Sequence, residues 1–257
     1  YIMLVKVNQD SGQEELEPFL SKVPDSLWAS SSTNIGRIKS AVPIEITINL
    51  SKPLPNVRQY PPRAKALLGI KPIIQDYLDK GLIIPCISPC STPILPPKKP
   101  NRKGWRFIQA QRPINKTTLD ILLFYPQHLS VNIPITTSHF SVIDLCSTFF
   151  STPVEQNSQY LFAFTWADHQ YTQMVCPKGY SMSPTYFSQI LKADLDDTEF
   201  PNESTLSIRM ISVVFILPGK MQEDTVHLLQ QLALKGRKVS NEKLQFCLPQ
   251  VKSVSYT

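Results

Sequence analysis

The stretch Phe-Ser-Val-Ile-Asp-Leu-Cys-Ser-Thr-Phe-Phe, residues 140–150, decides how the rest of the chain is interpreted. Its apolar run predicts a short buried strand, and Asp144 is the only charged residue in that run. A carboxylate in such a strand is costly unless a cation, a metal ion or a hydrogen-bond network compensates it. A lone strand aspartate caps a turn or meets a nearby arginine about as often as it has another role. The rest of the sequence therefore has to decide its function.

The composition limits the class of protein. The chain has 257 residues, 42% of them hydrophobic, which is enough for one large domain or two subdomains. A net charge of +6 favours, moderately, a polyanionic partner. Five cysteines without framework spacing predict reduced thiols and an intracellular protein, cytoplasmic or nuclear. No apolar run reaches the roughly 18 residues of a membrane span. Because the sequence opens without Met, we expect a fragment of a longer protein.

Hydrophobic periodicity predicts a mixed helix and strand protein behind a weakly ordered lead-in, residues 1–41. The expected strands are residues 42–50, 82–85, 105–109, 140–150, 160–166, 171–176, 210–217, 244–248 and 251–254. The expected helices are residues 63–80, 183–197 and 223–235.

Two of these helices carry features that the structure can check. In the first, Leu67, Ile70, Ile74, Tyr77 and Leu78 form one apolar face, and Pro72 predicts a kink or a break. In the second, Ser183 is expected as the N-cap with Pro184 in the first turn. The acidic residues at the end of that second helix are interpreted as a solvated face and not as a metal site; they are Asp194, Asp196 and Asp197.

The densest positive patch in the chain surrounds a predicted turn and the strand after it. Its members are Lys98, Lys99, Arg102, Lys103 and Arg106. One interpretation is a solvated hairpin tip. The other is a phosphate clamp, because Lys and Arg supply positive charge and directed donors to phosphate oxygens. The patch alone leaves both interpretations open.

The order of several motifs resembles the fingers and palm of gammaretrovirus-type reverse transcriptases, as in an endogenous retroviral Pol remnant. The resemblance spans roughly residues 42–252. The motifs include Leu-Gly-Ile-Lys-Pro at 68–72, Gly-Leu-Ile-Ile-Pro-Cys at 81–86, Ser-Thr-Pro-Ile-Leu-Pro at 91–96, Arg-Phe-Ile-Gln at 106–109, Val-Ile-Asp-Leu at 142–145, Cys-Pro-Lys-Gly-Tyr at 176–180 and Ser-Pro-Thr-Tyr-Phe at 183–187.

The resemblance implies an α+β right-hand polymerase fold with an antiparallel palm sheet and packed helices. It implies a truncated hand, without thumb, connection or RNase H regions. Fingers are expected at 42–118 and 155–180, and an incomplete palm at 119–154 and 181–257. The implied partners are an RNA or DNA template–primer and a deoxynucleoside triphosphate, with neither a membrane nor a small-molecule cofactor.

Roles for single residues also follow from the resemblance. Asp144 matches the first metal-binding carboxylate of the palm. Lys99 and Arg106 match residues that hold the phosphates of the incoming nucleotide, and Phe149 matches the aromatic residue under its sugar. Lys178 stands where the family has a glutamine beside the nucleotide. The remaining basic residues of the patch are expected to contact nucleic acid; they are Lys98, Arg102 and Lys103.

One part of the family's catalytic apparatus is missing from the sequence. Phosphoryl transfer by a two-Mg²⁺ site requires several carboxylate oxygens, which the family draws from the strand of Asp144 and from a Tyr-X-Asp-Asp turn. From Leu206 to Gln222 there is no Asp or Glu. Asp144 is then the sole surviving palm carboxylate, and we expect no productive Mg²⁺ binding. The strand before Arg112 differs as well, because Ala110 and Gln111 replace the Asp and Leu of the family's Gln-Asp-Leu-Arg.

A shifted reading frame is one hypothesis for this loss. Codons that encode residues 207–214, when read two bases later, can give Tyr-Thr-Asp-Asp-Leu-Cys-Cys. The hypothesis predicts a frame slip near Leu206 that is restored before Glu223. The gene sequence would contradict it by showing codons incompatible with the shifted reading.

Three functions are weighed on this basis. The favoured one is a reverse-transcriptase-like remnant that is catalytically inactive and keeps weak, non-specific nucleic-acid binding. The second is an active RNA-directed DNA polymerase, for which too few metal-binding carboxylates are present. The third is a decayed reading frame with no selected function.

Overall fold

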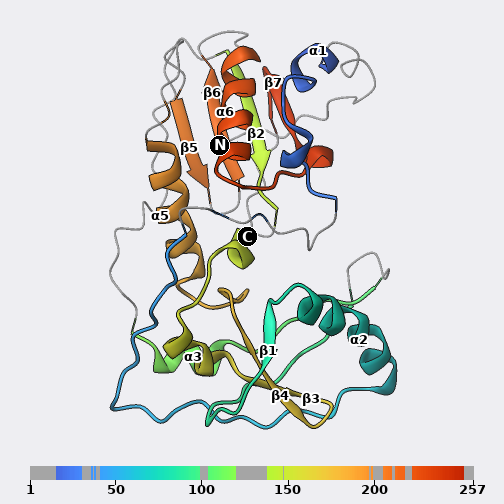
Figure 1. Ribbon diagram of the computed structural model, residues 1–257, viewed down its shortest axis with the longest axis vertical. Coiled ribbons are helices and arrows are strands. Elements are labelled where there is room, and N and C mark those ends of the chain that lie inside the picture. The colour runs from blue at the N-terminus through green and yellow to red at the C-terminus, as the bar shows by residue number, and fades with distance from the viewer. Residues whose placement is uncertain are drawn as a thin grey trace. The chain divides into compact units, whose positions relative to one another are not determined.

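The structure is a computed structural model that describes residues 16–30, 36, 38, 41–98, 104–119, 138–146, 148–196, 198, 205–209, 212–217 and 222–251 (Figure 1). The chain divides into two compact units. The first joins residues 1–40, 124–148 and 188–257, and the second joins 41–123 and 149–187. Both combine helices with antiparallel strands, which confirms the expected α+β class.

The first unit is built on a four-stranded sheet of order β5-β6-β2-β7 in which neighbouring strands are antiparallel. Its strands are β2 (His139–Asp144), β5 (Thr205–Arg209), β6 (Ser212–Leu217) and β7 (Gln245–Leu248). Helix α6 (Gln222–Leu234) packs against β7, and α1 (Glu17–Leu20) and the 3₁₀ turn η1 (Asp25–Leu27) pack against α6 (Figure 1). Buried leucines at 228, 229 and 232 belong to the apolar face through which α6 packs.

This unit differs from the sequence expectations in four places. The strand predicted at 140–150 ends at Asp144, and Thr148–Ser151 form a 3₁₀ turn. The single strand predicted at 210–217 is the second half of a hairpin, since β5 pairs with β6 from Thr205 to Arg209. Within the predicted lead-in, η1 buries Leu27 completely. No strand begins at Val251, and the rest of the strand predicted at 251–254 lies outside the described residues. Alternation alone could not reveal β5, because its polar and apolar residues form too short a run.

The second unit contains a three-stranded antiparallel sheet of order β1-β4-β3. Its strands are β1 (Ile83–Pro85), β3 (Phe164–Trp166) and β4 (His169–Gln173). Its helical elements are α2 (Ala64–Asp79), α3 (Arg112–Thr117), α4 (Gln156–Gln159) and the 3₁₀ turn η3 (Tyr160–Phe162). Ala167 and Asp168 connect β3 to β4 with φ values of 47° and 63°, the left-handed geometry of a tight hairpin turn. This turn lies between the strands predicted at 160–166 and 171–176.

Helix α2 departs from its prediction in two respects. It is one continuous helix that includes Pro72, so of the predicted kink or break the break is wrong, and the kink stays a prediction. Its buried face is formed by Ala66, Ile70, Ile74 and Tyr77, whereas Leu67 is 39% exposed. The missing N–H of Pro72 costs less here because the residue is on the exposed side of the helix, where water can satisfy the freed carbonyl group.

The segment predicted as a strand at 42–50 is extended but is not part of a sheet. It makes two isolated bridges, Ile44 with Val154 and Ile48 with Thr118. Ile44 and Ile46 are buried as the alternation predicted, while Leu50 is 88% exposed. The helix α5 (Ser183–Asp196) begins at the predicted residue, but Ser183 lies inside the helix and is not its N-cap; the Ser183 hydroxyl donates to Pro177 O at 2.9 Å. No described helix is both long and apolar enough to cross a membrane.

Alkaline pH is expected to destabilise the second unit through Cys176. Burial in a core cluster with Ile114 and Phe162 raises the pKa of this thiol from 9.0 to about 12. In the unfolded chain the thiol loses its proton near its ordinary pKa. The contribution of the buried, protonated thiol to the free energy of unfolding is therefore complete below about pH 9 and is lost as the pH approaches 12. Urea unfolding between pH 8 and 10 should show the free energy of unfolding falling, by up to about 1.4 kcal/mol per pH unit from this thiol.

The Cys176→Ala variant should remove that contribution. The half-buried Cys86 offers a matched control, and its alanine variant should keep most of the slope. An unchanged pH slope in Cys176→Ala would show that another group is responsible.

Candidate active site

Asp144 is the last residue of β2, where this central strand is paired with β6 on one side and β7 on the other. Its register partner on β6 is Ser212. The residue is only 8% exposed, yet Lys243 Nζ lies 2.8 Å from its Oδ2 atom. Of the compensations that the sequence left open for this carboxylate, the structure provides a cation. Lys243 comes from the 3₁₀ turn η4 (Asn241–Lys243), and its side chain is 66% exposed.

The backbone around Asp144 is held by the segment that follows α6. Ser240 N donates to Asp144 O at 3.0 Å, and Cys146 N donates to Lys238 O at 2.8 Å. The pKa of Cys146 is raised by burial and, secondly, by the negative charge of Asp144. The carboxylate therefore lies at a strand end whose backbone is hydrogen-bonded to the segment after α6, and Lys243 supplies its counter-charge.

The described residues do not fit the two-metal site that the resemblance implies. Ser212 is the register partner of both Asp144 and Arg209, so the β5–β6 hairpin ends beside the carboxylate. The two residues between the strands in sequence, Met210 and Ile211, carry no carboxylate and lie outside the described residues. In the described parts of the chain, no group of three His, Cys, Asp or Glu side chains is arranged to hold a metal ion. In the shifted reading frame of the hypothesis above, the two Asp codons would overlap codons 209–211, which lie where the β5–β6 hairpin ends.

Asp194 was wrongly predicted to belong to a solvated face. It is 2% exposed, and its Oδ2 accepts hydrogen bonds from Nε of Arg237, at 2.9 Å, and from Nη2 of the same side chain. Arg237 is 3% exposed. Burial lowers the pKa of this guanidinium, and Asp194 opposes that effect. Asp196 is exposed as predicted, and Asp197 lies outside the described residues. Helical spacing could not show that Asp194 meets a cation 43 residues later in the chain.

The basic patch is described only in part. Lys99, Arg102 and Lys103 lie outside the described residues, whereas Lys98 and Arg106 are exposed. These two belong to the arms of a hairpin, residues 93–98 and 105–110, which we call the basic hairpin. Lys98 and Trp105 form a bridge between the arms, and Arg106 N donates to Pro97 O at 2.9 Å. The arms are thus paired, although they are not the regular strand that the sequence predicted for 105–109.

Phe149 and Lys178 lie in the same compact unit as the basic hairpin, whereas Asp144 belongs to the other unit. Phe149, in the 3₁₀ turn η2 (Thr148–Ser151), packs edge-on against Phe187, with 6.2 Å between ring centroids. Lys178 is exposed, and its Nζ lies 5.2 Å from the ring centroid of Phe150. The structure therefore brings Lys178 to the aromatic pair at 149–150, which the sequence alone did not indicate.

Gln111 is a residue whose environment the sequence did not reveal. It is 4% exposed, and neither its Oε1 nor its Nε2 has a hydrogen-bond partner. Its side chain lies against Gly179, where an added Cβ would come within 3.5 Å of Gln111 Cγ. Leaving a buried amide without partners costs roughly 1–3 kcal/mol per group. The resemblance gives leucine at this position, which would fill the same space without that cost.

Replacing Gln111 with leucine is expected to stabilise the fold by roughly 1–3 kcal/mol, because the unpaired amide is removed. Gln109 is the matched control: it is also buried, but its Nε2 donates to Thr92 Oγ1 at 2.7 Å and to Phe162 O at 3.1 Å. Gln109→Leu should therefore destabilise. Urea unfolding measures the change in the free energy of unfolding for both variants. A change of the same sign in both would contradict the conclusion that the Gln111 amide is unpaired and the Gln109 amide is paired.

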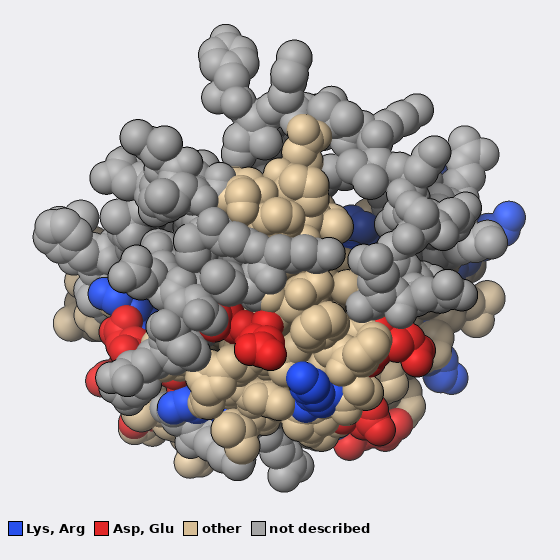
Figure 2. All heavy atoms as spheres, turned by 90° about the horizontal axis from the view of Figure 1, so that it is seen from above, with Lys and Arg blue, Asp and Glu red and all other residues tan. Residues whose placement is uncertain are grey.

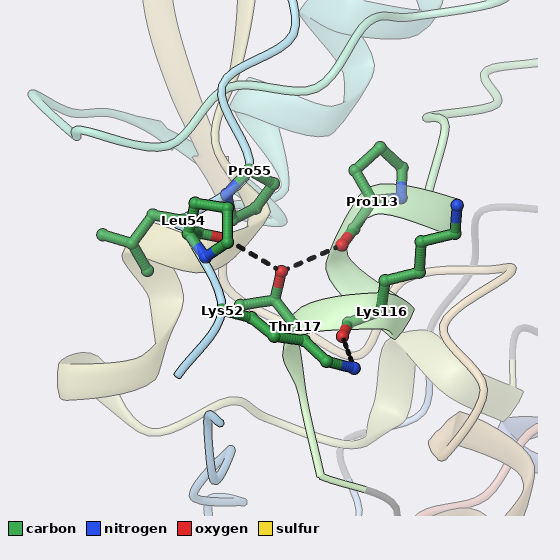
Figure 3. A pocket seen from close by; sticks show the side chains of 7 residues that line it. Lys52, Leu54, Pro55, Pro113, Lys116 and Thr117 are labelled. Atoms are coloured by element: carbon green, nitrogen blue, oxygen red, sulfur yellow. Dashed lines mark hydrogen bonds between the residues drawn. The ribbon is translucent and has the colours of Figure 1, made fainter. Parts of the chain in front are cut away.

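A separate pocket of about 390 Å³ lies beside α3 (Figure 3). Its walls are largely apolar and are formed by Pro53, Leu54, Pro55 and Pro113. Lys52 Nζ donates to Lys116 O at 2.6 Å at its edge, and the hydroxyl of Thr117 donates to two proline carbonyls (Figure 3). None of the site residues predicted from the sequence lines this pocket.

The face drawn in Figure 2 shows acidic and basic side chains intermixed. Among the described residues visible there, neither sign of charge forms a continuous patch.

Comparison with known proteins gives a consistent result. Residues 97–257 match the family described as "Reverse transcriptase (RNA-dependent DNA polymerase)". The chain is 40% identical over 240 residues to the Gag-Pol polyprotein of Walleye dermal sarcoma virus, covering 92% of this chain and 14% of that protein. It is 36% identical over 241 residues to the Pol polyprotein of Feline endogenous virus ECE1, covering 89% of this chain and 23% of that protein.

Solved structures with a similar fold include the foamy viral protease–reverse transcriptase in complex with an RNA/DNA hybrid. It matches with a TM-score of 0.80 and 27% identity, over 97% of this chain and 33% of that one. A second foamy viral protease–reverse transcriptase structure, in complex with double-stranded DNA, matches with a TM-score of 0.79 and 26% identity, over 97% of this chain and 43% of that one. This chain thus spans less than half of each of these relatives.

Proposed function

Because the chain belongs to the reverse transcriptase (RNA-dependent DNA polymerase) family, we propose that it is a polymerase-type domain that binds nucleic acid and does not polymerise. The observation that carries this proposal is at the end of β2. Asp144 meets the end of the β5–β6 hairpin, where the family places two acids, and this hairpin contains none. One carboxylate cannot neutralise a pair of Mg²⁺ ions, so the charge compensation for phosphoryl transfer is lost.

Two observations support nucleic-acid binding. Lys98 and Arg106 present their charges on the paired arms of the basic hairpin, in the unit that also holds Lys178. The chain has a net charge of +6, and cationic side chains that neutralise phosphates give sequence-independent affinity that falls steeply with salt. The similar foamy viral proteins are described in complex with double-stranded DNA and with an RNA/DNA hybrid, which makes duplexes the probes of choice.

Charge reversal in the basic hairpin is expected to weaken binding to an RNA–DNA hybrid by more than about tenfold at 50 mM salt, because two phosphate contacts become repulsive. The variant is Lys98→Glu/Arg106→Glu, and fluorescence anisotropy at several salt concentrations measures it. The slope of log Kd against log salt should fall by about two.

The control is a charge reversal on the same unit but outside the hairpin. Lys71 is exposed on α2, and Lys71→Glu should change the affinity far less and leave the salt slope nearly unchanged. Absence of any binding by the parent chain at 50 mM salt would remove the nucleic-acid part of the proposal.

A further inference from the structure

The basic hairpin is attached to α2 through one face of its second arm. Trp105 and Phe107 alternate with the exposed Arg106 and Ile108, so the two aromatic side chains share the inner face. Phe107 packs against Tyr77 of α2, with 5.3 Å between ring centroids. The positions of the charges on the outer face therefore depend on how the aromatic residues meet the helix.

Gly69 makes the contact with Trp105. This glycine lies inside α2, where glycine is less favourable than any residue except proline. A Cβ atom at position 69 would overlap Cδ1 and Nε1 of Trp105. The indole thus lies directly on the helix backbone, in space that only glycine leaves free. This packing explains why a poor helix former occupies the middle of a 16-residue helix.

The same tryptophan also meets a charged side chain. Lys98 Nζ lies 5.6 Å from the Trp105 ring centroid, within the range of a cation–π interaction. The residues also pair through the bridge between the two arms. Gly69 and Lys98 therefore both contact Trp105: the glycine leaves space for the ring, and the ring attracts the ammonium group.

We propose that Gly69 is a positioning residue for nucleic-acid binding: it admits the Trp105 ring and thereby fixes where the basic hairpin presents Lys98 and Arg106 to phosphates. This inference rests on the proposed function. It assigns a binding role to an uncharged residue, and it distinguishes the position of the charges on the hairpin from their number.

A double-mutant cycle tests the packing that underlies the proposal. Gly69→Ala alone should lower the melting temperature, because the new methyl group displaces the indole. In a Trp105→Ala background the same substitution should raise the melting temperature, because the space is free and alanine favours the helix. A change in melting temperature with the same sign in both backgrounds would contradict the proposed contact between Gly69 and Trp105.

Binding of an RNA–DNA hybrid tests the positioning role. At a temperature where the folded fraction is complete, Gly69→Ala should bind roughly threefold to tenfold more weakly, and its salt slope should fall by about one. The slope counts phosphate contacts and does not respond to a loss of stability alone. Leu68→Ala, at a 75% exposed neighbouring position, is the control and should keep the parent slope.

The two ways to fail are distinguishable. If the parent binds and Gly69→Ala keeps its affinity and slope, the positioning role is wrong while the proposed function stands. If the parent itself does not bind, the proposed function is wrong and the positioning role is wrong as well.

Tryptophan fluorescence tests the displacement of the ring directly. In a Trp28→Phe/Trp166→Phe background, in which Trp105 is the remaining tryptophan, the emission should shift to longer wavelength on Gly69→Ala.

Discussion

Replacing Arg237 with methionine is expected to lower the free energy of unfolding by roughly 3–5 kcal/mol, the largest stability effect expected for this chain. Asp194 and Arg237 are 2% and 3% exposed, so removal of the cation leaves a carboxylate buried without its counter-charge. The pair joins α5 to the segment after α6, which also holds the strand end at Asp144. Thermal and urea unfolding measure the change.

The matched control removes both charges. Replacing a buried ion pair with apolar residues of similar size is often neutral, because the desolvation cost disappears together with the attraction. Asp194→Leu/Arg237→Met should therefore recover most of the stability lost in Arg237→Met. A double variant as unstable as the single one would show that specific hydrogen bonds, and not the uncompensated charge, hold this site.

Primer extension is expected to give no product above the enzyme-free background. Loss of one preorganised electrostatic group commonly costs about 10²–10³ in rate, and here both acids of the family's turn are missing. The measurement uses a poly(rA)/oligo(dT) template–primer with Mg²⁺ or Mn²⁺. A product that disappears in the Asp144→Asn variant would contradict this expectation, since it would show that the remaining carboxylate still supports catalysis.

The parts of the fold that follow from local pattern could be predicted from the sequence. The position of the central strand β2, the helix α6 and the hairpin from Phe164 to Gln173 are examples, because each buries one periodic face or has a recognisable turn. The end of that strand was predicted wrongly, at 150 in place of Asp144. The predicted break at Pro72 was wrong, because a proline on the exposed side of a helix can be tolerated when the helix is packed on its other side.

The contacts of the candidate site depended on pairing between distant segments. Lys243 lies 99 residues after Asp144, and no sequence period connects the two. The same holds for Asp194 with Arg237 and for Gly69 with Trp105. The sequence did show that the segment from Leu206 to Gln222 contains no Asp or Glu, because the absence of these residues can be read from the sequence alone. The structure added the register that brings this acid-free hairpin to Asp144.

The central claim is that this palm lacks the carboxylates for a metal pair, and Mn²⁺ titration tests it most directly. Electron paramagnetic resonance counts free and bound Mn²⁺ without requiring any activity or any further domain. The parent chain should show no pair of sites, and Asp144→Asn should not alter its titration. The Met210→Asp/Ile211→Asp variant, which returns two acids to the β5–β6 connection, should gain Mn²⁺ binding that depends on Asp144. Two Mn²⁺ ions bound by the parent chain and released by Asp144→Asn would contradict the claim.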